Sequence, residues 1–146
     1  MDRSLTYLSH SPEETLEFAR KFGRELPEGA VLCFFGGLGA GKTTFIKGLA
    51  AGVAEYPEEH VSSPTFVILN IYEGKRVVYH FDLYRLQNEE QFLSLGFDQF
   101  LGQQGVACIE WAEKIQGLIP PEAYKITFTT LSEQDRSIEI RSWKDG

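Results

Sequence analysis

Residues 36–43 have the types and spacing of a phosphate-binding loop. They read GGLGAGKT and fit the pattern G-x-x-x-x-G-K-[ST]. In such a loop, successive backbone N–H groups bind the negatively charged phosphates, and the helix that follows adds the positive end of its dipole. We expect Lys42 to reach the β- and γ-phosphates and the Thr43 hydroxyl to bind Mg²⁺. The sequence therefore predicts a site for a nucleoside triphosphate with Mg²⁺.

The segments on either side of this loop are the ones that a phosphate loop requires. Residues 30–35 (AVLCFF) form a continuous apolar run, typical of a buried parallel strand, and residues 44–51 are compatible with a helix. Gly36, Gly39 and Gly41 permit backbone angles that a side chain forbids, and they let the backbone approach a phosphate closely. Strand, glycine loop and helix in this order indicate a genuine site.

Two apolar runs further along the chain end in a carboxylate. Asp82 follows the run VVYHF, and Glu110 follows the run VACI. A phosphate-loop enzyme uses an acid at a strand end to hold Mg²⁺ and a second group to orient or deprotonate the attacking water. The pattern alone does not assign these two roles. Each acid is also compatible with a polar residue at the point where a strand leaves the core.

Three neighbouring features keep more than one interpretation. Arg85, three residues after Asp82, either neutralises charge on the γ-phosphate or forms a structural ion pair, and the ion pair is favoured. Trp111 either lines the rim of the site, contacts a partner or packs in the interior. Residues 61–66 (VSSPTF) suit a loop beside a nucleotide, because a hydroxyl can bind Mg²⁺ or phosphate, and they equally suit an ordinary turn before a strand.

The remaining segments predict an α/β protein with two hairpins. A helix is expected to begin at Ser11, because SPEE combines an N-cap, a proline in the first turn and a capping-box glutamate at Glu14. Asn88 is expected to cap a second, short helix. Two pairs of strand-like segments predict hairpins: residues 66–72 with 77–82, and residues 124–130 with 137–142.

Composition and charge limit the classes of function. The chain has 146 residues, of which 42% are apolar and 13% aromatic, and this predicts one folded domain over residues 1–146. No apolar run reaches the roughly eighteen residues of a membrane helix, and the N-terminus has no signal pattern, so a cytoplasmic protein without a membrane contact is expected. The net charge of −7, without a basic cluster, argues against a nucleic-acid-binding face of its own.

The cysteines, the histidines and the absence of a guanine-recognition motif indicate which metal sites and which nucleotide to expect. Cys33 and Cys108 each lie inside an apolar run and are expected to be buried free thiols. His10, His60 and His80 are far apart in the sequence and form no ligand pattern, so no zinc site is predicted. The Asn-Lys-x-Asp element that usually recognises guanine has no internal match, which favours adenine and hence ATP.

Four stretches, in order, resemble the TsaE family, the small ATPase of bacterial tRNA threonylcarbamoyladenosine synthesis. They are residues 38–45 (LGAGKTTF), 63–66 (SPTF), 80–86 (HFDLYRL) and 109–111 (IEW). The phosphate loop alone is shared by many families, whereas the combination of all four is specific. The resemblance implies an α/β P-loop NTPase fold with three layers, in which a mixed, mainly parallel central sheet with antiparallel hairpins lies between helices.

The resemblance also implies an ATP-hydrolysing subunit that works with two partner proteins, TsaB and TsaD. In that family TsaD transfers the threonylcarbamoyl group to adenosine 37 of tRNAs that read codons beginning with A. The ATPase allows repeated turnover and meets tRNA through the complex. The alternative is a nucleotide-gated assembly module in which hydrolysis is incidental. A small-molecule kinase is disfavoured, because the chain has few arginines and no obvious lid insertion.

Carried over by position, the resemblance assigns the roles that the pattern leaves open. Glu110 takes the metal role together with Thr43, and Asp82 becomes the residue required for hydrolysis together with Lys42. The nucleotide-binding set implied by the resemblance comprises the loop, a residue of the switch-like segment and two later positions: Gly37, Leu38, Gly39, Ala40, Gly41, Lys42, Thr43, Thr44, Thr65, Trp111 and Arg136.

Overall fold

The structure of the chain is a computed structural model that describes residues 4–37, 39–61 and 68–145. The strands and α-helices of these residues are β1 (Leu5–Ser9), α1 (Pro12–Arg24), β2 (Ala30–Phe35), α2 (Lys42–Ala54), β3 (Leu69–Glu73), β4 (Val77–Asp82), α3 (Glu89–Ser94), β5 (Val106–Glu110), β6 (Tyr124–Thr130) and β7 (Arg136–Ser142). The short 3-10 helices are η1 (Glu58–His60), η2 (Phe97–Phe100), η3 (Ala112–Leu118) and η4 (Trp143–Asp145).

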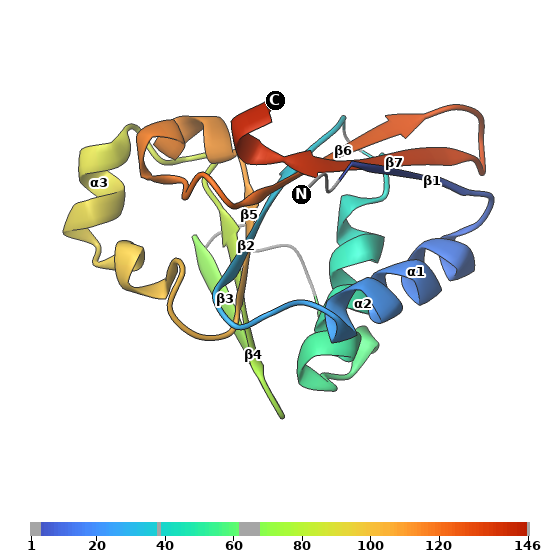
Figure 1. Ribbon diagram of the computed structural model, residues 1–146, viewed down its shortest axis with the longest axis horizontal. Helices are drawn as coiled ribbons and strands as arrows, with labels where there is room; N and C mark the ends of the chain where they lie inside the picture. Colours follow the sequence, from blue (N-terminus) through green and yellow to red (C-terminus); the bar gives the residue numbers. More distant parts are fainter. Residues whose placement is uncertain (1–3, 38, 62–67, 146) are drawn as a thin grey trace.

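The seven strands of the described residues form one sheet in the order β1-β7-β6-β2-β5-β4-β3. β2 runs parallel to both β5 and β6, and β4 runs parallel to β5. The two predicted hairpins are the antiparallel pairs β3–β4 and β6–β7, and β1 adds to β7 in the antiparallel sense. The sheet therefore has a parallel centre with antiparallel pairs at both edges (Figure 1), which confirms the predicted α/β fold.

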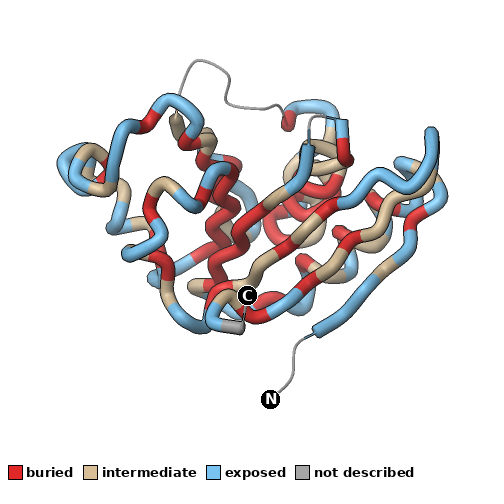
Figure 2. Tube along the Cα trace, turned by 90° about the horizontal axis from the view of Figure 1, so that it is seen from above, coloured by how far each residue is buried: buried red, intermediate tan, exposed pale blue. Residues whose placement is uncertain are grey.

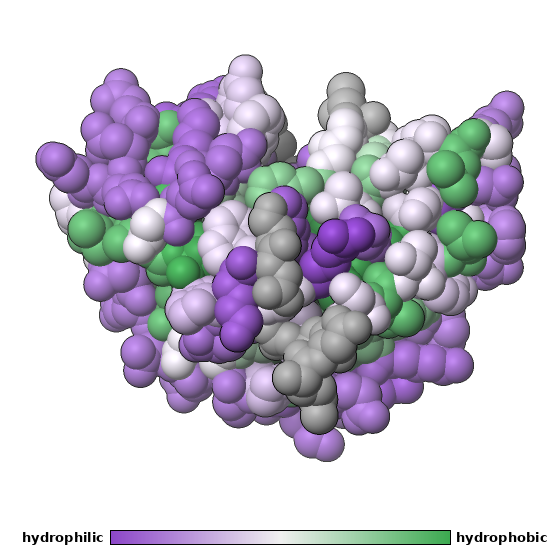
Figure 3. Space-filling model, turned by 45° about the horizontal axis from the view of Figure 1, so that its top comes forward, coloured by the Kyte–Doolittle hydropathy of each residue, from purple (hydrophilic) through white to green (hydrophobic). Residues whose placement is uncertain are grey.

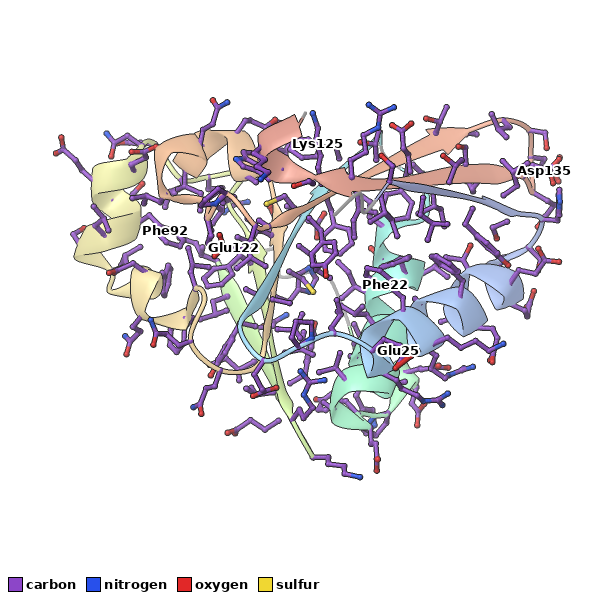
Figure 4. All side chains as sticks on the ribbon, in the orientation of Figure 1. Phe22, Glu25, Phe92, Glu122, Lys125 and Asp135 are labelled. Atoms are coloured by element: carbon purple, nitrogen blue, oxygen red, sulfur yellow. The ribbon has the colours of Figure 1, made fainter. Side chains whose placement is uncertain are left out.

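Helices cover both faces of this sheet. α1 and α2 lie on one face, and α3, η2 and η3 lie on the other (Figure 1). Phe22 of α1 and Phe92 of α3 point toward the sheet from opposite sides (Figure 4). The central strands are the most buried part of the trace (Figure 2), as expected for continuous apolar runs. None of the helices in the described ranges is long and apolar enough to cross a membrane.

α1 and α2 approach closely because two glycines of α2 place no side chain between them. A Cβ on Gly48 would lie 2.4 Å from the carbonyl oxygen of Leu16, and a Cβ on Gly52 would lie 2.2 Å from that of Arg20. Both distances are below van der Waals contact, so a methyl group at either position would force the helices apart. This packing holds α2, and with it the end of the phosphate loop, against α1.

The starts of α1 and α3 follow the predicted capping signals. Ser11 Oγ accepts a hydrogen bond from the Glu14 N–H at 3.1 Å, and Asn88 Oδ1 accepts one from the Gln91 N–H at 2.9 Å. The predicted capping box is displaced by one residue, because Glu14 Oε1 accepts from the N–H of His10 at 2.8 Å. The turn between β1 and α1 brings this N–H within reach of the glutamate.

The two cysteines are packing residues on opposite faces of the sheet. Cys33 lies in the core beneath α3, and Cys108 lies in the core beneath α1 and α2. Both are buried and free, which confirms the sequence interpretation. Burial raises the pKa of both thiols well above the ordinary value, because the interior disfavours a thiolate.

Candidate functional site

The phosphate loop lies between the end of β2 at Phe35 and the start of α2 at Lys42. Three of its glycines adopt positive φ angles, with values of 147° at Gly36, 78° at Gly39 and 104° at Gly41. Side chains rarely tolerate this left-handed region, so the backbone requires glycine at these positions, as predicted. Gly41 is also the N-cap of α2, so the loop leads directly into the positive end of the helix dipole.

Gly36 is required by space as well as by its backbone angle. A Cβ at this position would lie 2.9 Å from the carbonyl oxygen of Phe128 on β6. The Lys42 ammonium reaches back across the loop and donates a hydrogen bond to the Gly36 carbonyl oxygen at 2.8 Å. The predicted phosphate-binding lysine is therefore held over the loop rather than extended into solvent.

The remaining loop residues close the turn. The N–H of Ala40 donates to the carbonyl oxygen of Gly37 at 3.2 Å, and Thr43 and Thr44 lie half-buried in the first turn of α2. Two residues that the resemblance includes in the site, Leu38 and Thr65, lie outside the described residues, as does the rest of the segment 62–67.

The two predicted acids lie side by side at the ends of β4 and β5. Glu110 of β5 has two register partners, Asp82 of β4 on one side and Phe34 of β2 on the other. Both acids therefore lie at the carboxyl end of the parallel strands, next to the loop that leaves β2. Their environments differ, since Glu110 is 8% exposed whereas Asp82 is half-buried and accepts from the Tyr84 N–H at 3.1 Å.

A buried histidine that the sequence interpretation left without a role contacts Glu110. His80 is fully buried, and its Nε2 lies 2.8 Å from Glu110 Oε2. The hydroxyl of Tyr72 on β3 lies 3.2 Å from His80 Nδ1. The spacing between histidines along the chain could not reveal this contact. The available signal was the two-residue spacing between His80 and Asp82, which places both side chains on the same face of β4.

Two aromatic side chains form an exposed pair beside the acids. Trp111, directly after Glu110, is 41% exposed, and its ring centroid lies 5.1 Å from that of Tyr84, which is 62% exposed. The interpretation that Trp111 packs in the interior is therefore wrong, because β5 ends at Glu110 and the chain turns outward. Trp111 has a φ of 64°, a conformation that is uncommon for residues other than glycine. Arg85 is exposed, and both of its interpretations stay open.

Arg136 connects the phosphate loop to the turn between β6 and β7. Its Nη2 donates to the carbonyl oxygen of Gly39 at 3.3 Å. Its Nη1 donates to three carbonyl oxygens of the turn, those of Ser132, Glu133 and Asp135, at 2.9, 3.2 and 3.0 Å. The structure thus brings this arginine, far away in the sequence, to the loop.

A cavity of about 170 Å³ lies between the loop, the start of α1 and the β6–β7 turn. Its lining residues are Ser11, Pro12, Thr15, Gly39, Gly41, Thr44, Glu133, Gln134 and Arg136. Asp135 lies at the tip of the hairpin (Figure 4), where its Oδ1 is 2.9 Å from His10 Nδ1. This contact joins the hairpin to the segment that leads into α1.

Comparison with known proteins identifies the family. The family described as "Threonylcarbamoyl adenosine biosynthesis protein TsaE" matches residues 9–138. The chain belongs to the TsaE family. A protein named tRNA threonylcarbamoyladenosine biosynthesis protein TsaE from Treponema pallidum is 37% identical over 133 residues, covering 91% of this chain and 97% of that protein. Its namesake from Bacillus subtilis is 37% identical over 137 residues, covering 93% and 84%.

A solved structure agrees with this assignment to the TsaE family. The crystal structure of Bacillus subtilis YdiB matches with a TM-score of 0.78 at 32% identity, covering 99% of this chain and 89% of that one. The resemblance carried by the four sequence stretches is therefore confirmed, and so is the P-loop fold that it implies.

The predicted metal-binding positions of this TsaE-family chain carry oxygen atoms, which are the donors that Mg²⁺ prefers. Among the described residues, no three His, Cys, Asp or Glu side chains gather into a metal cluster. Mg²⁺ is commonly held by only one or two protein oxygens, together with water and nucleotide phosphates. A hydroxyl at Thr43 and a carboxylate at Glu110, carried by adjoining elements at the same end of the sheet, are oxygen donors of that kind.

Proposed function

We propose that this TsaE-family chain binds and hydrolyses ATP with Mg²⁺ in the synthesis of tRNA threonylcarbamoyladenosine. The observation that carries the proposal is the convergence of the phosphate loop with Asp82 and Glu110 at one end of the parallel strands. The pathway is supported by the names of the relatives, which assign them to this biosynthesis. Such a role belongs in the cytoplasm, where tRNA is modified.

Each group near the loop has a proposed part in hydrolysis. The backbone N–H groups of the loop and the Lys42 ammonium bind the phosphates, and Thr43 with Glu110 would hold Mg²⁺. The bound metal supplies positive charge to the phosphate oxygens. Asp82 binds the Tyr84 N–H through Oδ1, and the carboxylate orients or deprotonates the attacking water. Positioning and electrostatics account for most of the expected rate enhancement.

The cavity beside Arg136 is the proposed place of the nucleoside. It adjoins Gly39 and Gly41 of the loop, and it has polar walls from α1 and the hairpin. By holding the hairpin to Gly39, the arginine keeps two walls of the cavity together. Adenine is the proposed base, because the guanine-recognition element has no match inside the sequence.

Coupling to TsaB and TsaD is supported by the exposed pair Tyr84 and Trp111. Exposed aromatic side chains frequently anchor protein interfaces, and these two lie within two residues of the proposed catalytic acids. The face shown in Figure 3 is mostly hydrophilic, with small and separate hydrophobic areas. With a net charge of −7, the chain is proposed to meet tRNA through the complex.

The test is ATP hydrolysis by the purified chain, alone and with TsaB plus TsaD, for wild type, Lys42→Ala and Asp82→Ala. We expect weak activity alone, stimulation by the partners, and loss of that stimulation in both variants. Intact hydrolysis and tRNA modification in Lys42→Ala would contradict the proposal. If Asp82→Ala lost hydrolysis but sustained repeated tRNA modification, the chain would act as a nucleotide-gated assembly module instead.

A further inference from the structure

We propose that His80 is a positioning residue that holds the Glu110 carboxylate in the orientation required for the metal. The inference rests on the proposed function, in which Glu110 is a metal ligand. It adds His80 of β4 to the metal site as a residue that supports the ligand Glu110 and does not contact the metal itself.

Burial makes the contact between His80 and Glu110 specific. His80 is 0% exposed, and a buried imidazole needs a hydrogen-bond partner for each ring nitrogen. Both partners are present, Glu110 Oε2 at 2.8 Å from Nε2 and the Tyr72 hydroxyl at 3.2 Å from Nδ1. The ring is therefore fixed from two sides, by neighbouring strands of the same sheet.

The contact with Glu110 places a proton on Nε2 of His80. An ionised carboxylate only accepts hydrogen bonds, so Nε2 must carry a proton and donate the hydrogen bond to Glu110. The contacts link Tyr72, His80 and Glu110 in one series across β3, β4 and β5. Tyr72 is itself supported by the Tyr56 ring, whose centroid lies 4.9 Å away.

The consequence for Glu110 is a carboxylate that is oriented before any ligand arrives. A glutamate has three rotatable side-chain bonds, and ordering them on binding costs free energy. A bond at Oε2 from a buried donor removes most of that freedom in advance, whereas Asp82 receives its hydrogen bond from a backbone N–H near the surface. Partners of this kind determine metal affinity in many sites, although they do not touch the metal.

The first test compares Mn²⁺ binding to the nucleotide complex in wild type, His80→Gln and His80→Leu, measured by electron paramagnetic resonance. Loss of the donor in His80→Leu should weaken Mn²⁺ binding about tenfold to a hundredfold. The glutamine side chain offers an N–H donor near the position of Nε2, so its affinity should lie closer to wild type. Nucleotide binding in EDTA should be the same in all three. His60→Leu, at an exposed histidine, is the matched control.

Two outcomes separate this inference from the function on which it rests. A wild-type chain that binds no Mn²⁺ in the presence of nucleotide would overturn the metal site itself. Normal wild-type affinity that is fully retained in folded His80→Leu would overturn the positioning role alone. Equal weakening in folded His80→Gln and His80→Leu would overturn the role of the N–H donor.

The second test needs no variant of His80 and no metal. Nitrogen-15 correlation spectra of the imidazole groups in the wild-type chain should show a proton on Nε2 of His80. Tyr72→Phe, which removes only the hydroxyl, should shift the Nδ1 resonance while Nε2 stays protonated. A ring without a proton on Nε2 would overturn the inferred hydrogen bond from His80 to Glu110, even if His80→Leu did not fold.

Discussion

Two walls flank the phosphate loop, and they are built in different ways. The acid wall consists of His80, Asp82 and Glu110 at the ends of β4 and β5, where the register of the parallel strands sets every position. The hairpin wall consists of Arg136 and the pair His10–Asp135. The acid wall is largely buried, with His80 at 0% and Glu110 at 8% exposure, whereas the side chains of the pair are 64% and 41% exposed.

The difference in burial indicates what each wall can contribute. Hydrogen bonds in the interior are strengthened by the low local dielectric, and a partner left unpaired there is costly. Ion pairs at the surface are screened by water and salt and contribute little. We therefore expect changes in the acid wall to affect the chemical step and the metal, and changes in the hairpin wall to affect nucleotide affinity and local stability.

The largest effect is expected from Asp82→Asn. The amide keeps the size of the side chain but cannot accept a proton from water, so kcat for ATP hydrolysis should fall about 10²- to 10⁴-fold. ATP affinity, measured by calorimetry, should change little, because the loop and Lys42 stay intact. Asp98→Asn, at an exposed position on η2, is the control and should behave as wild type. Unchanged kcat in Asp82→Asn would remove this residue from the mechanism.

Glu110→Gln should weaken metal binding more than nucleotide binding. The amide has one weaker oxygen ligand and no negative charge, so the Mg²⁺ concentration for half-maximal hydrolysis should rise by about a hundredfold. Loss of a residue that only supports a metal ligand typically lowers metal affinity by about tenfold to a hundredfold, so loss of a ligand should reach the upper end of that range. Excess Mg²⁺ should restore part of the rate, which it cannot do for Asp82→Asn. Glu139→Gln on β7, where the side chain is 38% exposed, is the control. An equal Mg²⁺ requirement in wild type and Glu110→Gln would exclude Glu110 from the metal site.

The sequence allowed much of the acid wall to be predicted, because its signals are local. The glycine spacing required a loop after a strand, and the apolar runs before Asp82 and Glu110 indicated two strands that end in acids. The contact of His80 with Glu110 could not be predicted in the same way. It depends on β4 pairing with β5 in one particular register, and the contact itself joins residues 30 positions apart.

The hairpin wall and the exposed aromatic pair show a second limit of sequence reasoning. Both strands of the hairpin were predicted from alternation, but the position of its turn over the phosphate loop follows from the strand order, which places β6 next to β2. Trp111 remained ambiguous because its exposure depends on a left-handed φ of 64° directly after β5. Patterns of residue type carry no information on such a single backbone angle at a residue other than glycine.

Arg136→Ala should have a smaller effect than either acid variant. The change removes the bond to Gly39 and those to the turn, so the cavity loses the connection between two of its walls. Hydrogen bonds of a charged donor contribute about 1.5 kcal/mol at the low end, so ATP affinity should weaken roughly tenfold while kcat stays near wild type. Arg141→Ala, on the same strand and paired with Glu139, is the control. A large loss of kcat with normal ATP affinity would mean that Arg136 acts in the chemical step, as the acid wall does, rather than in nucleotide binding.

The smallest effect is expected from the pair His10–Asp135, and it should depend on pH. The hydrogen bond that the His10 ring donates to Asp135 raises the pKa of His10 above its ordinary value of 6.5, and the same bond lowers the pKa of Asp135 below 3.8. The His10 contribution to stability is complete below its unfolded pKa and is lost as the pH rises through the raised value. The Asp135 contribution is present above its unfolded pKa and is lost as the pH falls through the lowered value.

Both contributions are present between the ordinary pKa values of 3.8 and 6.5. His10→Gln should therefore lower the urea midpoint most near pH 5, about midway in this window, and much less near pH 8. The effect at the lower pH should also shrink in about 1 M salt, because the pair is exposed. Unfolding followed by circular dichroism at both pH values measures this difference, with His60→Gln as the control. An equal decrease at both pH values would mean that His10 acts through its packing, and the hairpin wall would then resemble the acid wall more closely than its exposure indicates.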